Sequence, residues 1–406
     1  SWLLAASLVF APLTSLRVYE MLGVCDVLFI AAVGVGVIER MFYREPMQVV
    51  PIYLLAALLF IASYLANLGQ GQDDPNYDKY FYILLINAVL IPCATLLIRI
   101  RSPGEMRFLI YAWTFGAFYG AAFAVLYCKG FIPGHYEYYW THLGRVQGLT
   151  PHPNVQALNS VLLVPGLLMM FCIHRSPWLR GLIVAMLVVA WQAIDYSGSR
   201  VTIVMFVLMI LVFAFLFFLQ ATARQRTWII RGLLVLTLVA LVVFAIVSIG
   251  PPRPQSALWR LFYAHHLSSN DDRAKYNGWA WAGFMAAPLF GQGYQWSRVA
   301  HNIYLQQLHT AGIVGLLAYL ITLLTPGFYL LRSALIGRDR LLTLTLATSN
   351  IVLLVAAIYW SSYTDLNVTY VFCLALYAGG LLSRPDGQVA QSSPTVERSL
   401  QGPATS

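Results

Sequence analysis

The sequence predicts an all-α membrane protein with about twelve transmembrane helices, and its composition carries this prediction. Hydrophobic residues make up 59% of the 406 positions and charged residues only 10%, whereas a soluble domain usually carries about 25% charged residues. Apolar stretches of roughly 20 residues, the length that crosses a bilayer, recur along the chain. We therefore expect a single transmembrane domain over residues 1–384.

The apolar stretches are centred near residues 9, 30, 57, 90, 118, 164, 187, 210, 241, 318, 350 and 374. No cleavable signal pattern precedes the first stretch, which we expect to act as its own insertion signal. The five cysteines lack metal-ligand spacing and are expected to pack as small apolar residues. Residues 385–406 are polar and without apolar periodicity, which predicts a disordered tail.

The basic residues predict the orientation. The even-numbered short loops carry Arg40, Arg44, Arg99, Arg101, Arg107, Arg175, Arg180, Arg224, Arg226, Arg231, Arg332, Arg338 and Arg340. The odd-numbered short loops carry only Arg17, Lys79, Lys129, Arg145 and Arg200. Because short cytoplasmic loops are enriched in Lys and Arg, the even loops, the N-terminus and the tail are predicted to be cytoplasmic.

One long external loop, about residues 250–300, breaks this pattern by carrying five basic residues, among them Arg260 and Arg273. Long loops escape the charge rule, so the orientation still holds. Residues 258–263 and 276–284 are aromatic and amphipathic, and such segments lie along bilayer surfaces. We expect helices that rest on the outer leaflet and contact membrane lipid.

Motifs for nucleotide, zinc or redox chemistry are missing from the sequence. No cofactor or metal is therefore predicted, and the energy for any reaction must come from an activated substrate or an ion gradient. The formal net charge of +9 follows from the cytoplasmic loops and the long external loop, so no nucleic-acid partner is predicted.

The most distinctive segment is Pro288-Leu-Phe-Gly-Gln-Gly293, followed by His301-Asn302, nine residues, and Gly312-Ile-Val-Gly315. Three further fragments accompany it: Gly148 to Asn154, Ser199-Arg200, and Arg273 six residues before Trp279. Over about residues 140–320 this combination resembles the bacterial O-antigen ligase superfamily. That family includes lipid A-core ligases, O-antigen polymerases and pilin O-oligosaccharyltransferases.

The resemblance implies a multi-pass protein of the bacterial inner membrane whose active site faces the periplasm. Its donor would be a glycan linked to undecaprenyl pyrophosphate, and its acceptor a sugar hydroxyl of lipid A-core. The relatives use the same kind of donor with a glycan or a serine as acceptor. The short external connection between the last two apolar stretches disfavours the pilin enzyme, and the polymerase stays an alternative.

The chemistry of such a reaction assigns roles to particular residues. Pyrophosphate is a good leaving group that needs only cations, and Arg200 and Arg273 would supply them through planar guanidinium groups. His301 would remove the proton from the acceptor hydroxyl, which predicts inverting, metal-independent transfer. The same resemblance and loop positions nominate Asn302, Arg145, His152 and Arg260 as substrate-binding residues. Helix capping by Asn302 and a headgroup contact by Arg260 are the alternatives.

Two other expectations complete the site. His309 lies eight residues deeper and is predicted to pack against a neighbouring helix. Asp195 and Asp365 are candidates to pair with arginines, in either a structural or a functional role. A secondary transporter is the alternative from another class, but transporters gather ionisable groups near the midplane, whereas here such groups collect at the external ends of the stretches.

Overall fold

The computed structural model describes residues 2–13, 17–19, 22–42, 50–68, 77–98, 100, 102–133, 144–220, 222, 226–227, 256–262, 268–294, 300–336, 339–359 and 366–382. The regular secondary structure of this part of the chain is helical apart from two short antiparallel strands, β1 (Arg17–Tyr19) and β2 (Leu22–Gly23). The predicted helical class is therefore confirmed.

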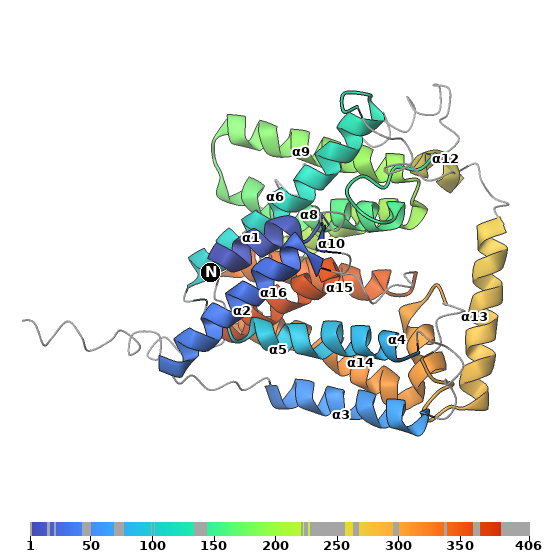
Figure 1. The fold of residues 1–406 in the computed structure, drawn as a ribbon. Coiled ribbons are helices and arrows are strands. Elements are labelled where there is room, and N and C mark those ends of the chain that lie inside the picture. Colours follow the sequence, from blue (N-terminus) through green and yellow to red (C-terminus); the bar gives the residue numbers. More distant parts are fainter. Residues whose placement is uncertain are drawn as a thin grey trace, which may run out of the picture.

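Most of the described helices pack side by side in a bundle (Figure 1). The described helices are α1 (Trp2–Phe10), α2 (Val24–Phe42), α3 (Val50–Ala66), α4 (Tyr77–Leu85), the π-helix η1 (Ile86–Leu90), α5 (Ile91–Thr95), α6 (Pro103–Cys128), α8 (Pro153–Ile173), α9 (Pro177–Ser197), α10 (Arg200–Gln220), α12 (Ala257–Phe262), α13 (Ser268–Ala286), α14 (Ile303–Ile336), α15 (Arg340–Ala356) and α16 (Leu366–Leu382). The predicted stretch near residue 241 and the tail lie outside the described residues.

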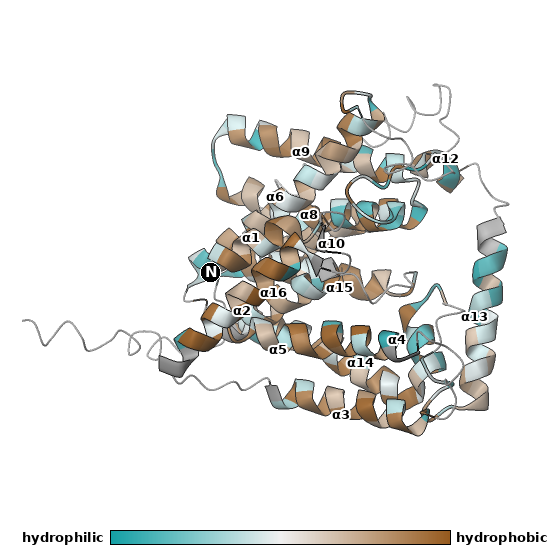
Figure 2. Cartoon of the chain, viewed as in Figure 1, coloured by the Kyte–Doolittle hydropathy of each residue, from teal (hydrophilic) through white to brown (hydrophobic). Residues whose placement is uncertain are grey.

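Five of the described helices, α6, α8, α9, α10 and α14, are long and apolar enough to cross a membrane. Shorter apolar helices cover residues 51–66, 79–95, 340–356 and 368–379, and α1 has only nine residues. The composition thus correctly predicted a chain of apolar helices that could span a membrane, while the number of twelve spans stays a prediction. Figure 2 shows the hydrophobic colouring of the bundle helices.

The two ends of the bundle differ. At one end, α6 and α15 begin, and Asp339 both caps α15 and accepts a 2.7 Å ion pair from Arg107 of α6. At the other end α8 and α14 begin, and α13 lies across the helix ends, at the right of Figure 1. We call this second end the α13 end. Figure 2 shows that α13 is more hydrophilic than the bundle helices.

Helix α14 is interrupted at Gly312, whose φ of 64° and ψ of −162° are not helical. A side chain there would collide with the backbone of Leu289 and Phe290, and one at Gly291 would collide with the backbone around Ala311. Only glycine permits this backbone conformation and this approach. The glycines at 291 and 312 thus have a structural role, since they let the loop after α13 enter the break.

Candidate active site

A tight turn between α9 and α10 presents Arg200. Helix α9 ends in Gly198, which adopts the left-handed conformation with φ of 67°, and the Ser199 N–H donates to Ser197 Oγ at 3.2 Å. Arg200 follows as the first residue of α10. The N-terminus of a helix carries a partial positive charge, so a cation is unfavourable there. The turn therefore places the Arg200 guanidinium at a position that the helix dipole alone disfavours.

Arg145 joins the segment before α8 to the end of α9. Its Nε donates to the Ser197 carbonyl at 2.7 Å, and its Nη2 donates to Asn154 Oδ1 at 2.5 Å. The neighbouring Val146 N–H donates to the Tyr196 carbonyl at 3.1 Å. Arg145 therefore holds its own loop against the C-terminal end of α9, where the helix dipole favours cations.

Arg260, on the short helix α12, binds the same turn from another direction. Its Nη1 donates to the Gly198 carbonyl at 2.8 Å. Asp195 Oδ1 accepts from the Leu258 N–H at 3.0 Å, so this carboxylate ties α12 to α9. The predicted pairing of Asp195 with an arginine stays untested, whereas its contact with the α12 backbone is a feature that the sequence did not reveal.

Helix α13 turns one face towards the start of α14. The ring centroids of Tyr276 and His301 are 6.4 Å apart, and those of Trp279 and His309 are 3.9 Å apart. His309 is only 2% exposed, which agrees with the predicted packing role. Arg273 lies three residues before Tyr276 on α13, so the helix carries this cation to the neighbourhood of His301.

His301 and Asn302 immediately precede the first turn of α14. Asn302 Oδ1 accepts from the Leu305 N–H at 3.1 Å, a capping bond that satisfies one of the free amides of the helix start. The Ile303 N–H donates to the carbonyl of Ala357, the residue that follows α15, at 2.9 Å. These bonds fix the backbone beside His301, and Asn302 has a capping role in addition to its predicted contact with substrate.

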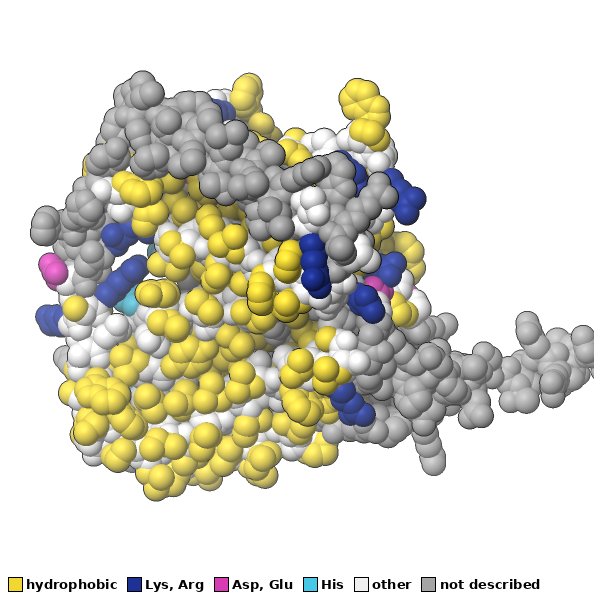
Figure 3. Space-filling view, turned by 180° about the vertical axis from the view of Figure 1, so that it is seen from behind, with side chains coloured by type: hydrophobic (Ala, Val, Ile, Leu, Met, Phe, Trp, Pro, Cys, Tyr) yellow, Lys and Arg dark blue, Asp and Glu magenta, His cyan; other side chains and the backbone are white. Residues whose placement is uncertain are grey.

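The four predicted arginines are close enough to perturb one another. Burial, then Arg260 and Arg273, lower the pKa of Arg145 to about 10. Burial and the charges of Arg200 and Arg273 lower the pKa of Arg260, and burial and Arg200 lower that of Arg273. Like charges that oppose one another in a partly buried region favour the binding of an anion. Figure 3 shows basic side chains and a histidine gathered in a hollow at one edge of the molecule.

The two predicted histidines belong to the same cluster. Burial, then Arg145 and His301, lower the pKa of His152. Burial and Arg273 lower the pKa of His301, while the Asp272 carboxylate acts in the opposite direction. His152 also caps α8, because its Nδ1 accepts from the Asn154 N–H at 3.1 Å. Both shifts favour the neutral imidazole, the form that can accept a proton.

Sequence reasoning missed two side chains near His301. Asp272 and Tyr276 are one helical turn apart on α13 and therefore share a face. Tyr276 meets the His301 ring, and Asp272 acts on its charge. Their spacing around Arg273 is the only signal in the sequence, and it becomes readable once α13 is known to be helical.

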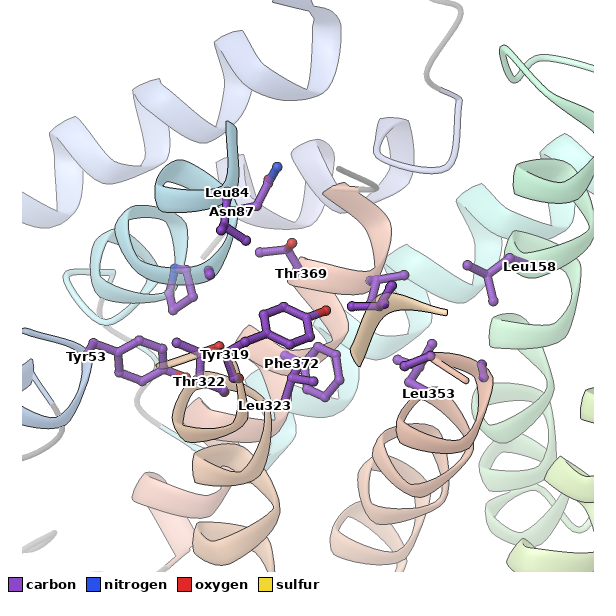
Figure 4. A pocket seen from close by; sticks show the side chains of 16 residues that line it. Tyr53, Leu84, Asn87, Leu158, Tyr319, Thr322, Leu323, Leu353, Thr369 and Phe372 are labelled. Atoms are coloured by element: carbon purple, nitrogen blue, oxygen red, sulfur yellow. Dashed lines mark hydrogen bonds between the residues drawn. The ribbon is translucent and has the colours of Figure 1, made fainter. Parts of the chain in front are cut away.

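An apolar cavity of about 720 Å³, including the part open to the outside, lies within the bundle (Figure 4). Its walls come from α3, α4, η1, α5, α8, α14, α15 and α16, and no charged side chain is among them. It adjoins the candidate site only at Ile303. An anionic group would be poorly stabilised there, so the cavity is separate from the cationic cluster.

No family model and no curated protein matches the chain. The site must therefore be interpreted from its own chemistry. It combines several guanidinium groups and two imidazoles at one end of an apolar helical bundle. Such a site suits a strongly anionic group, such as a pyrophosphate, presented next to a hydroxyl that must lose a proton.

Proposed function

We propose that the chain is an O-antigen ligase, which moves a preassembled glycan from undecaprenyl pyrophosphate to a sugar hydroxyl of lipid A-core. One observation carries the proposal. The ionisable site residues predicted from the sequence come from five separate segments: those before α8 and α14, and the helices α10, α12 and α13. Their charges nevertheless act on one another at the α13 end. This clustering supports a shared role of these residues in binding one anionic group.

In the proposed reaction the arginines hold the donor pyrophosphate. When the bond from the anomeric carbon to the phosphate oxygen breaks, the electron pair stays on that oxygen and the pyrophosphate gains a negative charge. Guanidinium groups fixed beside this oxygen stabilise the transition state more than the ground state, which is the requirement for catalysis. Arg200 and Arg273 have this role, while Arg145 and Arg260 hold the turn before Arg200 and add positive charge.

His301 acts as the general base. The acceptor hydroxyl oxygen attacks the anomeric carbon from the side opposite the pyrophosphate, and its proton passes to the neutral imidazole. Direct displacement inverts the configuration at that carbon. Arginine cations supply the charge that a magnesium ion supplies in many phosphate sites, so the proposed transfer needs no metal.

The proposed orientation follows from the loops. About twelve spans, with the arginine-rich short loops and residues 385–406 in the cytoplasm, would put the α13 end at the periplasmic face of the bacterial inner membrane. The proposed substrates are displayed on that face. The cationic cluster at the α13 end, rather than at mid-bundle, favours this reading over a secondary transporter.

Reconstitution tests the proposal and separates it from its nearest alternative. Purified protein in liposomes would be given the lipid-pyrophosphate glycan with and without lipid A-core. A ligase forms glycosylated lipid A-core only when both are present. An O-antigen polymerase instead lengthens the glycan on its lipid carrier without lipid A-core. Absence of both products from active, correctly inserted protein would contradict the whole proposal.

A further inference from the structure

The loop after α13 is built into the break of α14 by backbone hydrogen bonds on both sides of Gly312. The Gln292 and Gly293 N–H groups donate to the carbonyls of His309 and Thr310, at 2.7 and 3.0 Å. The Ile313 and Val314 N–H groups donate to the carbonyls of Pro288 and Leu289, at 2.9 and 3.2 Å. The loop therefore replaces the bonds that the interrupted helix has lost.

Two polar side chains, Ser63 in the last turns of α3 and Asn67 directly after its end, hold this arrangement from the other side. Ser63 Oγ donates to the carbonyls of Phe290 and Ala311, both at 3.1 Å. The Asn67 amide donates to the Phe290 carbonyl at 2.6 Å and to the Ser63 carbonyl at 2.9 Å. Ser63 and Asn67 are 0% and 1% exposed. They join loop, broken helix and α3 at one point, and we call this pair the α3 clamp.

The residue that follows the loop is anchored to the same helix. Tyr294 is 1% exposed, and its ring lies 6.3 Å from that of Tyr64 on α3 and 5.5 Å from that of Phe81 on α4. Tyr64 and Phe81 stack at 4.1 Å. The loop that follows α13 is thus fixed to α3 through both hydrogen bonds and aromatic packing.

Helix α13 extends from this anchored loop to the cationic cluster. Arg273 lies 13 residues before Ala286, which at 1.5 Å per residue is about 20 Å from the end of the helix. A tilt of about 10° at the anchor would move Arg273 by about 3.5 Å, more than the length of a hydrogen bond. Trp279 of α13 also packs against His309, with ring centroids 3.9 Å apart, so the anchored loop and this contact together set the direction of α13.

We propose that Ser63 and Asn67 are positioning residues of the transfer site: by holding the Phe290 carbonyl in the break of α14, they fix the direction of α13 and with it Arg273 relative to His301. The proposal deepens the proposed function and, in its kinetic part, rests on it. Neither residue touches the cationic cluster. Their effect passes through the loop and α13.

The first test measures the direction of α13 without any reference to activity. Spin labels would be attached at Lys129, after α6, and at Lys275, on α13, in protein whose five native cysteines are replaced by alanine. Both positions are exposed. The distance distribution from pulsed electron spin resonance would be compared between the parent and the double variant Ser63→Ala/Asn67→Ala.

A matched control is available on α15. Ser349 and Asn350 are 3% and 2% exposed, and their side chains donate to carbonyls of their own helix, Thr345 and Leu346. The double variant Ser349→Ala/Asn350→Ala removes the same groups without touching the loop. We expect one narrow distance peak in the parent and control, and a peak broadened or shifted by about 3 Å in the clamp variant.

The second test measures transfer. In the clamp variant we expect kcat to fall by at least tenfold, KM for the donor to rise, and the acid limb of the pH profile to move to higher pH because Arg273 no longer lowers the pKa of His301. A general loss of stability would not shift a pKa. The single variant Ser63→Ala serves if the double variant does not fold, and the same changes are expected at smaller size.

The outcomes separate the two proposals. An unchanged, narrow distance distribution in the clamp variants would overturn the clamp, whatever the activity. A broadened distribution with unchanged kcat, KM and pH profile would overturn its link to transfer. If the parent itself transfers no glycan, the proposed function fails, and the distance measurement still decides whether Ser63 and Asn67 set the direction of α13.

Discussion

Both ends of the helical bundle carry arginines, but the partners of their guanidinium groups differ. At the end where α6 and α15 begin, Arg107 meets the Asp339 carboxylate at 2.7 Å. At the α13 end, Arg145 and Arg260 donate instead to the backbone carbonyls of Ser197 and Gly198. Carbonyl groups replace lost water contacts but carry no net charge. Arg107 thus has a carboxylate partner, whereas the hydrogen bonds of Arg145 and Arg260 add no negative charge; in the proposed function the donor pyrophosphate supplies that charge.

The largest effect in this comparison is expected at His301. Removal of a well-placed general base lowers rates by roughly 10²- to 10⁴-fold, so His301→Ala should reduce transfer by about that factor while donor binding persists. His309→Ala should reduce transfer far less, since His309 packs against Trp279. Initial transfer rates and donor binding would be measured for both. Normal transfer by His301→Ala, or failure caused only by lost donor binding, would move the role of base to another residue.

A smaller effect concerns pH and has opposite signs for two neighbours on α13. A base works in its neutral form, so activity falls as pH drops through its pKa. Arg273 lowers the pKa of His301 and Asp272 raises it. Arg273→Ala should therefore move the acid limb of kcat to higher pH, and Asp272→Asn should move it to lower pH.

The pH profile of each variant would be compared with that of Lys275→Ala, an exposed cation on the same helix that is not among the charges acting on His301. Shifts of the same sign for the Arg273 and Asp272 variants, or no shift in either, would mean that His301 does not titrate in the rate-limiting step.

The smallest expected effect is that of a chelator. If guanidinium groups alone compensate the pyrophosphate, transfer by purified protein should be unchanged in excess chelator and unstimulated by magnesium or manganese. The measurement is the initial rate with and without each addition. A requirement for an added divalent ion would reassign the charge compensation from arginine to metal.

Many of the helices can be predicted from short stretches of the sequence. The apolar stretches correctly predicted where helices such as α8 and α10 lie, because their length and composition are properties of short windows. His301, Arg200 and Arg273 can be predicted as site residues for the same reason, since each lies in a short, recognisable motif. The break in α14 could also be suspected from Gly312, although not what fills it.

The remaining features depend on contacts between distant segments. Asn67 meets Phe290 across 223 positions of sequence, and Arg260 meets Gly198 across 62. No local pattern marks such pairs, because Ser and Asn also occur in helices for purely local bonding, as Ser349 and Asn350 do. For that reason the α3 clamp, and the capping of the α9 end by Arg145 and Arg260, emerge only from the three-dimensional arrangement.

If the arginines at the α13 end bind a lipid pyrophosphate, their removal should weaken the equilibrium binding of undecaprenyl pyrophosphate to the purified protein. The double variant Arg200→Ala/Arg273→Ala would be compared with Arg332→Ala/Arg340→Ala, which removes the same charge at the opposite end. A third variant, Arg200→Lys/Arg273→Lys, keeps the charge but not the planar fork of donors.

We expect Kd to rise by about 100-fold or more in the first variant, to stay unchanged in the control, and to rise by an intermediate factor with lysine, since hydrogen bonds to charged groups contribute about 1.5–3 kcal/mol each. Equal affinity of the parent and the three double variants, or an equal loss of affinity when arginines are removed at either end, would mean that Arg200 and Arg273 do not bind the pyrophosphate.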